Sequence, residues 1–350
     1  MTLTELSFYS RKLLPFGIIT VLMLLIFVYV VKLLLVFDTT TISSKPVINT
    51  VFQQIKPPDI EEATSSGKFK YTLDTIEGTP ITATSAGYVY FLPPTTTKLQ
   101  FKDKTYRMAK TIGIDTDVTK HTLVNEINYL FQDELQKLEV DITNFNFSYE
   151  YKLENDQDIL TDIKAPPSEG EVKNTAIDFL KTLGRYPDEL AQGKYNIIYM
   201  NFNPNTKELT VSQDPKNANL VEVDFYRPDV LSYPIVSRKY FNSQNYVALV
   251  YYRNLFKIVR AQVHFFEKST EQVGMYPLKT GEQAWSDFQD GKGWVTVAPA
   301  DQKNITVKQM FLGYYDPDIY QQYLQPVYVF LGDNNFVGYV PAIEDAWLLK

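Results

Sequence analysis

A single uncharged apolar run, from Leu13 to Val31, constrains this chain more than any other feature. At a rise of about 1.5 Å per residue, a helix of about 19 residues just spans the hydrocarbon core of a bilayer. The run continues past Lys32, and a lysine near the end of such a helix can extend its ammonium group to the lipid headgroups. We therefore expect a transmembrane signal anchor over residues 13–37, after a cytoplasmic tail over residues 1–12.

The charges beside this run predict its orientation. Arg11 and Lys12 precede it and Asp38 follows it, which favours an N-terminus in the cytoplasm. A cleaved signal peptide is the alternative, but its apolar region would be about 7–15 residues long and end in small residues, and Phe37–Thr41 offers no such site. The expected location is the cell membrane, with a single pass and the C-terminal domain outside the cytoplasm.

Composition excludes several classes of function. The net charge is −7 and the pI is near 5.1, so no basic face for nucleic acid is expected. The chain has no cysteine, which excludes disulfides, thiolate catalysis and cysteine-ligated metals. This is typical of an exported bacterial domain that is stabilised by packing alone.

The remainder of the chain divides by pattern into a linker and three modules. Residues 38–67 are rich in Thr, Ser and Pro and have no sustained period, which predicts a linker. A short helix that ends in glycine and is followed by strands then occurs about three times, over residues 68–160, 161–245 and 246–350. The predicted fold class is α+β: one N-terminal transmembrane helix followed by tandem mixed modules with antiparallel sheets.

Caps and hydrophobic periodicity predict four helices. They are a helix capped by Asp103 and ended by Gly113, a helix over Val118–Leu138, a helix with a Ser168–Glu171 capping box that ends at Gly184, and a helix with a Thr280–Gln283 capping box that ends at Gly291.

Alternation and turn residues predict the strands. Phe145–Leu153 shows the clearest alternation, with Phe and Tyr on one face and polar residues on the other, and is expected to be a buried sheet face rather than a ligand platform. The other predicted strands are Lys68–Leu73, Pro80–Thr84, Tyr88–Leu92, Tyr195–Phe202, Glu208–Ser212, Val221–Tyr226, Tyr246–Tyr252, Phe256–Phe266, Trp294–Val297, Ile305–Tyr314, Pro326–Leu331 and Phe336–Ile343.

No residue pattern predicts catalysis, a cofactor or a metal site. Of the two histidines, His264 is expected on a solvated sheet face, and His121 in the first turn of its helix without a partner at ligand spacing. The sequence contains no G-x-S-x-G nucleophile elbow, no glycine-rich phosphate-binding loop followed by Lys-Ser/Thr, and no H-E-x-x-H zinc-binding motif. Solvated turns or helix faces are expected for the carboxylate pairs, which are Asp115/Asp117, Asp156/Asp158, Asp287/Asp290, Asp316/Asp318 and Glu344/Asp345.

From about Gln262 onward the chain resembles the extracytoplasmic part of the YycH/YycI family of two-component-system regulators. The resemblance is carried by Tyr276–Trp285, Leu312–Tyr315, Leu324–Phe330 and Gly338–Ile343. The earlier units are similar to PepSY-like modules. Where many relatives have tryptophan, this chain has Tyr328. The motif residues expected to build the fold are Ala284, Trp285, Gly291, Leu312, Gly313, Tyr314, Pro326, Tyr328 and Tyr339.

The resemblance implies a non-enzymatic, membrane-anchored protein that restrains a membrane sensor kinase, and the residues alone identify no small-molecule ligand. An alternative is an envelope polymer- or peptide-binding module that uses exposed tyrosines. A third hypothesis is an envelope hydrolase with dispersed carboxylates, which predicts a carboxyl group in a cleft with a strongly raised pKa.

Overall fold

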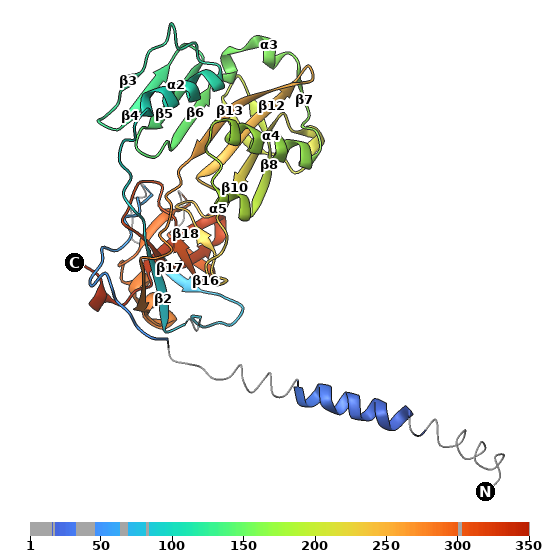
Figure 1. Cartoon of the computed structure of the whole chain (residues 1–350), viewed down its shortest axis with the longest axis vertical. Coiled ribbons are helices and arrows are strands. Elements are labelled where there is room, and N and C mark those ends of the chain that lie inside the picture. The colour runs from blue at the N-terminus through green and yellow to red at the C-terminus, as the bar shows by residue number, and fades with distance from the viewer. Residues whose placement is uncertain are drawn as a thin grey trace, which may run out of the picture. The chain divides into compact units, whose positions relative to one another are not determined.

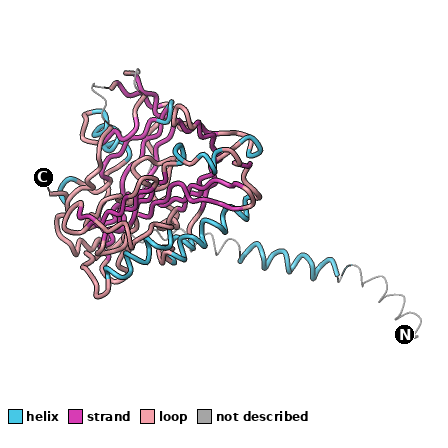
Figure 2. The backbone as a smooth tube through the Cα atoms, turned by 90° about the horizontal axis from the view of Figure 1, so that it is seen from above, coloured by secondary structure: helices cyan, strands magenta, loops and turns pink. Residues whose placement is uncertain are grey.

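The computed structural model describes residues 16, 18–32, 46–63, 69–81, 84–299 and 303–349. The chain divides into two compact units, residues 1–47 and residues 48–350. Figure 1 labels the helices and strands of the second unit, and Figure 2 shows that strands make up most of its regular structure.

Residues 18–32 of the first unit are helical, with exposed side chains along their whole length. Within the part of the chain that the structure describes, no helix has the length and apolarity needed to cross a bilayer. Residues 1–12, and both ends of the predicted anchor over 13–37, lie outside the described residues, as do residues 38–45 and 64–67 of the predicted linker.

Strands of the second unit form two sheets. The first sheet has ten strands in the order β3-β4-β5-β6-β13-β12-β10-β8-β9, with β7 paired to β12, and all of its pairs are antiparallel. Its strands are β3 (Thr122–Leu123), β4 (Asn128–Gln132), β5 (Gln136–Asp141), β6 (Phe147–Tyr151), β7 (Ile163–Lys164), β8 (Tyr195–Asn203), β9 (Glu208–Val211), β10 (Leu220–Phe225), β12 (Asn245–Tyr252) and β13 (Leu255–Val263).

The second sheet has eight strands in the order β1-β16-β17-β18-β15, with β2 between β14 and β17 and with β11 beside β16. Its β1–β16 and β11–β16 pairs are parallel and its other pairs antiparallel. Its strands are β1 (Lys70–Leu73), β2 (Ala86–Phe91), β11 (Ile235–Val236), β14 (Val273–Pro277), β15 (Trp294–Val297), β16 (Asn304–Tyr315), β17 (Tyr323–Gly332) and β18 (Phe336–Pro341).

The described residues of the second unit form five α-helices: α2 (Phe101–Ile112), α3 (Gln157–Leu160), α4 (Glu169–Thr182), α5 (Asp188–Gln192) and α6 (Gly281–Gln289). The glycines predicted to end the longer helices, Gly113, Gly184 and Gly291, all have positive φ. The Thr280–Gln283 capping box of α6 is complete, as predicted. Of the predicted Ser168–Glu171 box, the structure shows the half in which the Ser168 side chain accepts from the Glu171 amide and caps α4. The predicted cap Asp103 is wrong, because it lies inside α2 and Gln100 precedes that helix.

The helix predicted over Val118–Leu138 is wrong, because this segment forms β3, β4 and the start of β5. Polar side chains make its turns: Asn125 accepts hydrogen bonds from the amides of residues 127 and 128, and Asp133 accepts them from the amides of residues 135 and 136. Burial alternates with period two through Tyr129 and Phe131. The segment contains apolar residues three and four positions apart, as in a helix, but some of these residues are exposed. The Asx turns and the alternation of buried residues therefore decide its structure.

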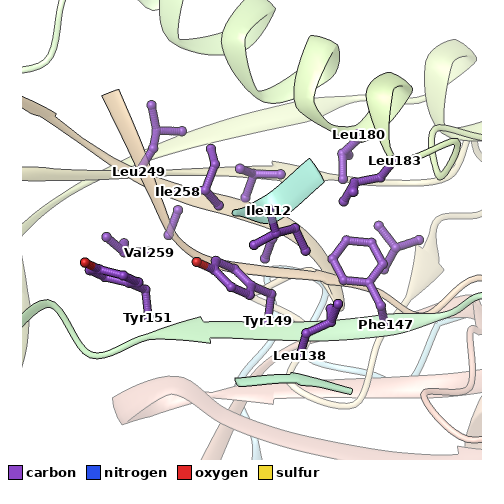
Figure 3. Close-up of a cluster of buried hydrophobic side chains, with 14 of the residues drawn as sticks. Ile112, Leu138, Phe147, Tyr149, Tyr151, Leu180, Leu183, Leu249, Ile258 and Val259 are labelled. Atoms are coloured by element: carbon purple, nitrogen blue, oxygen red, sulfur yellow. The ribbon is translucent and has the colours of Figure 1, made fainter. Parts of the chain in front are cut away.

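The aromatic strand predicted over Phe145–Leu153 is confirmed as β6. Phe147, Tyr149 and Tyr151 point into the core of the ten-stranded sheet, where they face Leu180 and Leu183 from the α4 side (Figure 3). This face is packed, as expected for a buried sheet face rather than a ligand platform.

Strand pairing crosses the predicted module boundaries. β2 lies in the predicted first module, yet it pairs with β14 and β17 of the predicted third module. β6 and β13 likewise come from different predicted modules and pair with each other. The predicted strand over Pro80–Thr84 lies partly outside the described residues, and Pro80, Ile81 and Thr84 are not in a strand.

A buried ion network joins the two sheets. Arg227 follows β10 of the ten-stranded sheet, and its Nη1 donates to Oδ1 of Asp316, 2.8 Å away, in the segment after β16 of the eight-stranded sheet. Its Nη2 and Nε donate to the carboxylate of Glu189 in α5. Although burial lowers the pKa of Arg227, these two carboxylates outweigh it and raise that pKa above its ordinary value.

We expect Arg227→Met to lower the free energy of unfolding by about 3–5 kcal/mol, because it leaves two carboxylates without their cation at a buried site. Urea denaturation of the purified chain, followed by tryptophan fluorescence, measures this change. Lys194→Met is the matched control: Lys194 is paired with Asp229 on the surface, and its loss should change stability by less than about 1 kcal/mol. A similar small change for Arg227→Met would contradict the prediction.

Candidate functional site

The helix-free face of the ten-stranded sheet carries polar residues where a core face would be apolar. In β10, Val221, Val223 and Phe225 belong to the apolar core, and the alternation of the strand places Glu222 and Asp224 on the other face. The register pairs Glu222 with Ala248 of β12, which pairs in turn with Arg260 of β13. Charged side chains from the two strands that flank β12 thereby share one face of the sheet, where the charge of Arg260 acts on Glu222.

This face forms one wall of a cavity of about 370 Å³, which we call the carboxylate cavity. The ten-stranded sheet contributes Met200, Glu222, Tyr246, Arg260 and Gln262. Segments that follow strands of the eight-stranded sheet also line it: Ser237, Arg238 and Lys239 after β11, and Asp318 after β16. The walls of the carboxylate cavity therefore come from both sheets.

Two buried carboxyl groups dominate the chemistry of this region. Burial raises the pKa of Glu222. The positive charges of Arg260 and Lys239 lower this pKa, but burial outweighs them. Burial and the charge of Glu222 raise the pKa of Asp224 to about 7, although it accepts hydrogen bonds from the Ser243 amide and the Tyr226 hydroxyl. Glu222 lines the cavity, whereas Asp224 is fully buried. Near pH 7 this pair can carry a proton.

Three buried polar atoms here have no hydrogen-bond partner among the residues that the structure describes. They are Oδ1 of Asp224, Oε1 of Gln244 and Nδ1 of His264. Buried polar atoms are normally paired with protein or with ordered water. Because Gln244 and His264 line the cavity, it suits water or a small polar molecule that offers hydrogen bonds.

The histidines do not lie where the sequence predicted. His264 is turned into the carboxylate cavity rather than to open solvent, and burial lowers its pKa. His121 is in no helix: its ring stacks on Tyr129 with centroids 4.0 Å apart, and its Nδ1 lies 2.8 Å from the Tyr106 hydroxyl. The structure does not bring the two together into one site.

Two of the carboxylate pairs also need correction. Asp287 is not on an exposed helix face, because it is buried and forms ion pairs with Lys279 and Lys292. Asp316 is not in a solvated turn, because it is buried and pairs with Arg227. The solvated interpretation overlooked a partner cation in both cases: Lys279 and Lys292 lie near Asp287 in the sequence, whereas Arg227 lies far from Asp316.

The other acids serve turns or lie on the surface. Asp115 accepts from the amide of Asp117, and Asp156 caps α3. Glu344 and Asp345 are exposed, and Asp345 pairs with Lys279. Among the residues that the structure describes, no group of three or more acidic or histidine side chains could hold a metal ion.

Sequence reasoning missed Glu222 and Asp224. The signal was present: two acids at positions i and i+2 within the otherwise apolar strand Leu220–Phe225 mark one polar face. The hydrolase hypothesis asked for a carboxyl group in a cleft with a strongly raised pKa. Glu222 lines the cavity and its pKa is raised, but the pKa raised to about 7 belongs to Asp224, which does not line it.

The predicted motif residues pack in and around the eight-stranded sheet. Most are buried: Ala284, Leu312, Tyr314, Tyr328 and Tyr339 are in the core, Pro326 and Gly313 are in the paired strands β17 and β16, Trp285 is half-buried against the core, and Gly291 ends α6. The Tyr339 hydroxyl donates to the carbonyl of Ser237 over 2.7 Å and so holds one wall of the carboxylate cavity. The Tyr328 hydroxyl donates to the carbonyl of Lys279.

No family model matches the chain, and no curated protein does. Among solved structures, an uncharacterized protein from Eubacterium rectale is similar at 13% identity, with a TM-score of 0.34, over 82% of this chain and 87% of that one. YycH from Bacillus subtilis is similar at 13% identity, with a TM-score of 0.34, over 75% of this chain and 54% of that one.

The C-terminal domain of YpeB from Bacillus megaterium is similar at 12% identity, with a TM-score of 0.28, over 72% of this chain and 95% of that domain. The match to YycH spans about half of the length of that chain. These similarities assign the chain to no family.

We expect Asp224→Asn to change how stability depends on pH. Asp224 has a pKa of about 7 in the folded chain against 3.8 as its ordinary value, so between these values the folded state binds a proton that the unfolded state has lost. Stability from this group therefore falls as pH rises from about 4 to about 7. Replacing the Asp224 carboxyl group should lessen the fall in stability by a few kcal/mol, because a shift of one pKa unit corresponds to about 1.4 kcal/mol.

Urea midpoints of the wild type and Asp224→Asn between pH 4 and pH 8 measure this difference. Asp178→Asn, on the exposed side of α4, is the control and should follow the wild type. Parallel curves for all three proteins would show that Asp224 is not held protonated by its surroundings.

Proposed function

We propose that this chain is a non-enzymatic regulatory protein that is anchored in the cell membrane, with its second unit outside the cytoplasm, and that acts on a membrane protein partner. The observation that carries the proposal is the carboxylate cavity, whose walls come from both sheets. A molecule bound there contacts both sheets, so its binding energy can favour one arrangement of the sheets over another. A partner that contacts the body can respond to that shift.

Three features of the sequence support the location and the class of partner. The apolar run from Leu13 to Val31 supports an anchor, and the charges beside it support an outward-facing body. The residues that resemble the YycH/YycI family favour a membrane sensor kinase as the partner. Binding of an envelope polymer by exposed tyrosines has less support, because among the described tyrosines only Tyr29, Tyr195 and Tyr320 are exposed.

One edge of the ten-stranded sheet suits contact with a protein. β3 ends the sheet, and among the described strands its one partner is β4. Around it, Val118, Leu123 and Val124 are 79%, 64% and 52% exposed. An exposed sheet edge with clustered apolar side chains is a surface that other chains can pair with or cover. We place the partner contact here.

Protease digestion of intact cells tests the proposed location, with an epitope tag added after Lys350. An outward-facing body should lose the tag without lysis, and a chain lacking residues 1–37 should not be retained in the membrane. Protection of the tag until the cells are lysed would place the body in the cytoplasm and overturn the proposal.

Crosslinking in membranes, followed by mass spectrometry of the captured membrane proteins, tests the partner contact. Leu123→Glu should reduce capture of a sensor kinase several-fold, because the charge must be desolvated in the interface. Val211→Glu is the matched control, since Val211 is 72% exposed on β9 at the opposite edge of the same sheet. Equal capture by the two variants would move the contact away from β3.

A further inference from the structure

A second cavity, of about 670 Å³, lies in a different part of the body and concentrates positive charge. It forms where the loop after β2, the first half of α2, the turn between β5 and β6 and the segments after α4 and β13 meet. Four cationic side chains line it, and we call it the cationic cavity: Lys98, Lys104, Arg107 and Arg185. Two carboxylates, Asp103 and Glu267, also line it.

These four cations lack carboxylate partners. Among the described residues, none of them forms an ion pair, although Asp103 and Glu267 are nearby. Burial, followed by the charges of Arg185, Lys98 and Arg107, lowers the pKa of Lys104. The positive charges therefore repel one another, and an anion among them would relieve that repulsion.

Arg185 is the deepest of these cations. Its Nη2 donates to Oδ1 of Asn146, but its Nε is buried and has no hydrogen-bond partner in the described part of the chain. Burial lowers the pKa of Arg185 to about 10, although the carboxylates of Glu267 and Asp141 raise it. The guanidinium therefore stays charged at neutral pH. A buried guanidinium with an unused donor is suited to a carboxylate or phosphate oxygen.

Part of the remaining wall is apolar, and Thr95, Gln100, Thr143 and Asn144 make it polar elsewhere. Nζ of Lys104 lies 3.9 Å from the centroid of the Phe145 ring, and Phe265 and Phe266 continue this aromatic surface. Pro93, Pro94 and Leu99 line the side formed by the loop after β2. A molecule that fills the cavity can place an anionic group among the cations and an apolar group against the rings.

We propose that the cationic cavity binds a small organic anion, with its carboxylate or phosphate group between Arg185 and Lys104 and its apolar part against Phe145 and Phe265. This site goes beyond the proposed function, since it depends neither on the partner nor on the carboxylate cavity.

Isothermal titration calorimetry on the full chain, in a non-ionic detergent and a phosphate-free buffer, tests this site with phenyl phosphate, benzoate and inorganic phosphate. We expect saturable binding of phenyl phosphate or benzoate, and about tenfold weaker binding to Lys104→Gln, the loss of one charge-assisted hydrogen bond. Lys104 is chosen because the Arg185 guanidinium is held by Asn146 and its replacement can prevent folding. The tighter of the two organic anions identifies the preferred head group.

Lys102→Gln is the matched control. Lys102 is exposed on the same helix and does not line the cavity, so this variant should bind as the wild type does. If both substitutions weakened anion binding equally, the loss would come from long-range charge rather than from contact in the cavity, and the proposed site would be wrong. Absence of saturable binding at millimolar concentration would also overturn it, and equal affinity for inorganic phosphate and phenyl phosphate would overturn the role of the aromatic wall.

Discussion

The buried guanidinium of Arg227 is the interaction on which the arrangement of the second unit depends. It contacts Asp316 on one sheet and Glu189 beside the other, and Asp316 also accepts a hydrogen bond from the Gln244 side chain. A charge removed from water is tolerated only when partners replace its hydration. Since those partners come from three distant parts of the chain, the network forms only when both sheets are folded and correctly placed.

Both cavities follow from the way the ten-stranded sheet is covered. Its apolar face packs against α4 (Figures 1 and 3), while the opposite face carries Glu222, Asp224 and Arg260 and is enclosed by segments of the other sheet. At the end of β13, His264 lines the carboxylate cavity and the next residue, Phe265, lines the cationic cavity. Alternation at one strand end thus places neighbouring residues in two different cavities, and each cavity is lined by more cationic than carboxylate side chains.

Local signals in the sequence predicted much of this fold. The predicted strands Tyr246–Tyr252 and Phe256–Phe266 form β12 and β13, joined by a turn at Arg253 and Asn254, and the capping box of Thr280 begins α6. The largest error, the helix over Val118–Leu138, came from reading a spacing of three and four without the competing Asx turns at Asn125 and Asp133. Where side chains hydrogen-bond to backbone nearby, local chemistry decided the structure more reliably than periodicity did.

By itself, the sequence determined the apolar run, the absence of cysteine chemistry, most strand positions and the helix ends, because these depend on residues close together in the chain. Only the tertiary structure decided which strands pair, as when β2 joins β14 and β17, and which acids become buried. Asp316 looks alike in sequence to an acid on the surface. The fold buries this acid, which raises its pKa, and places it beside Arg227 from a distant segment, and pairing over such a distance leaves no local pattern to read.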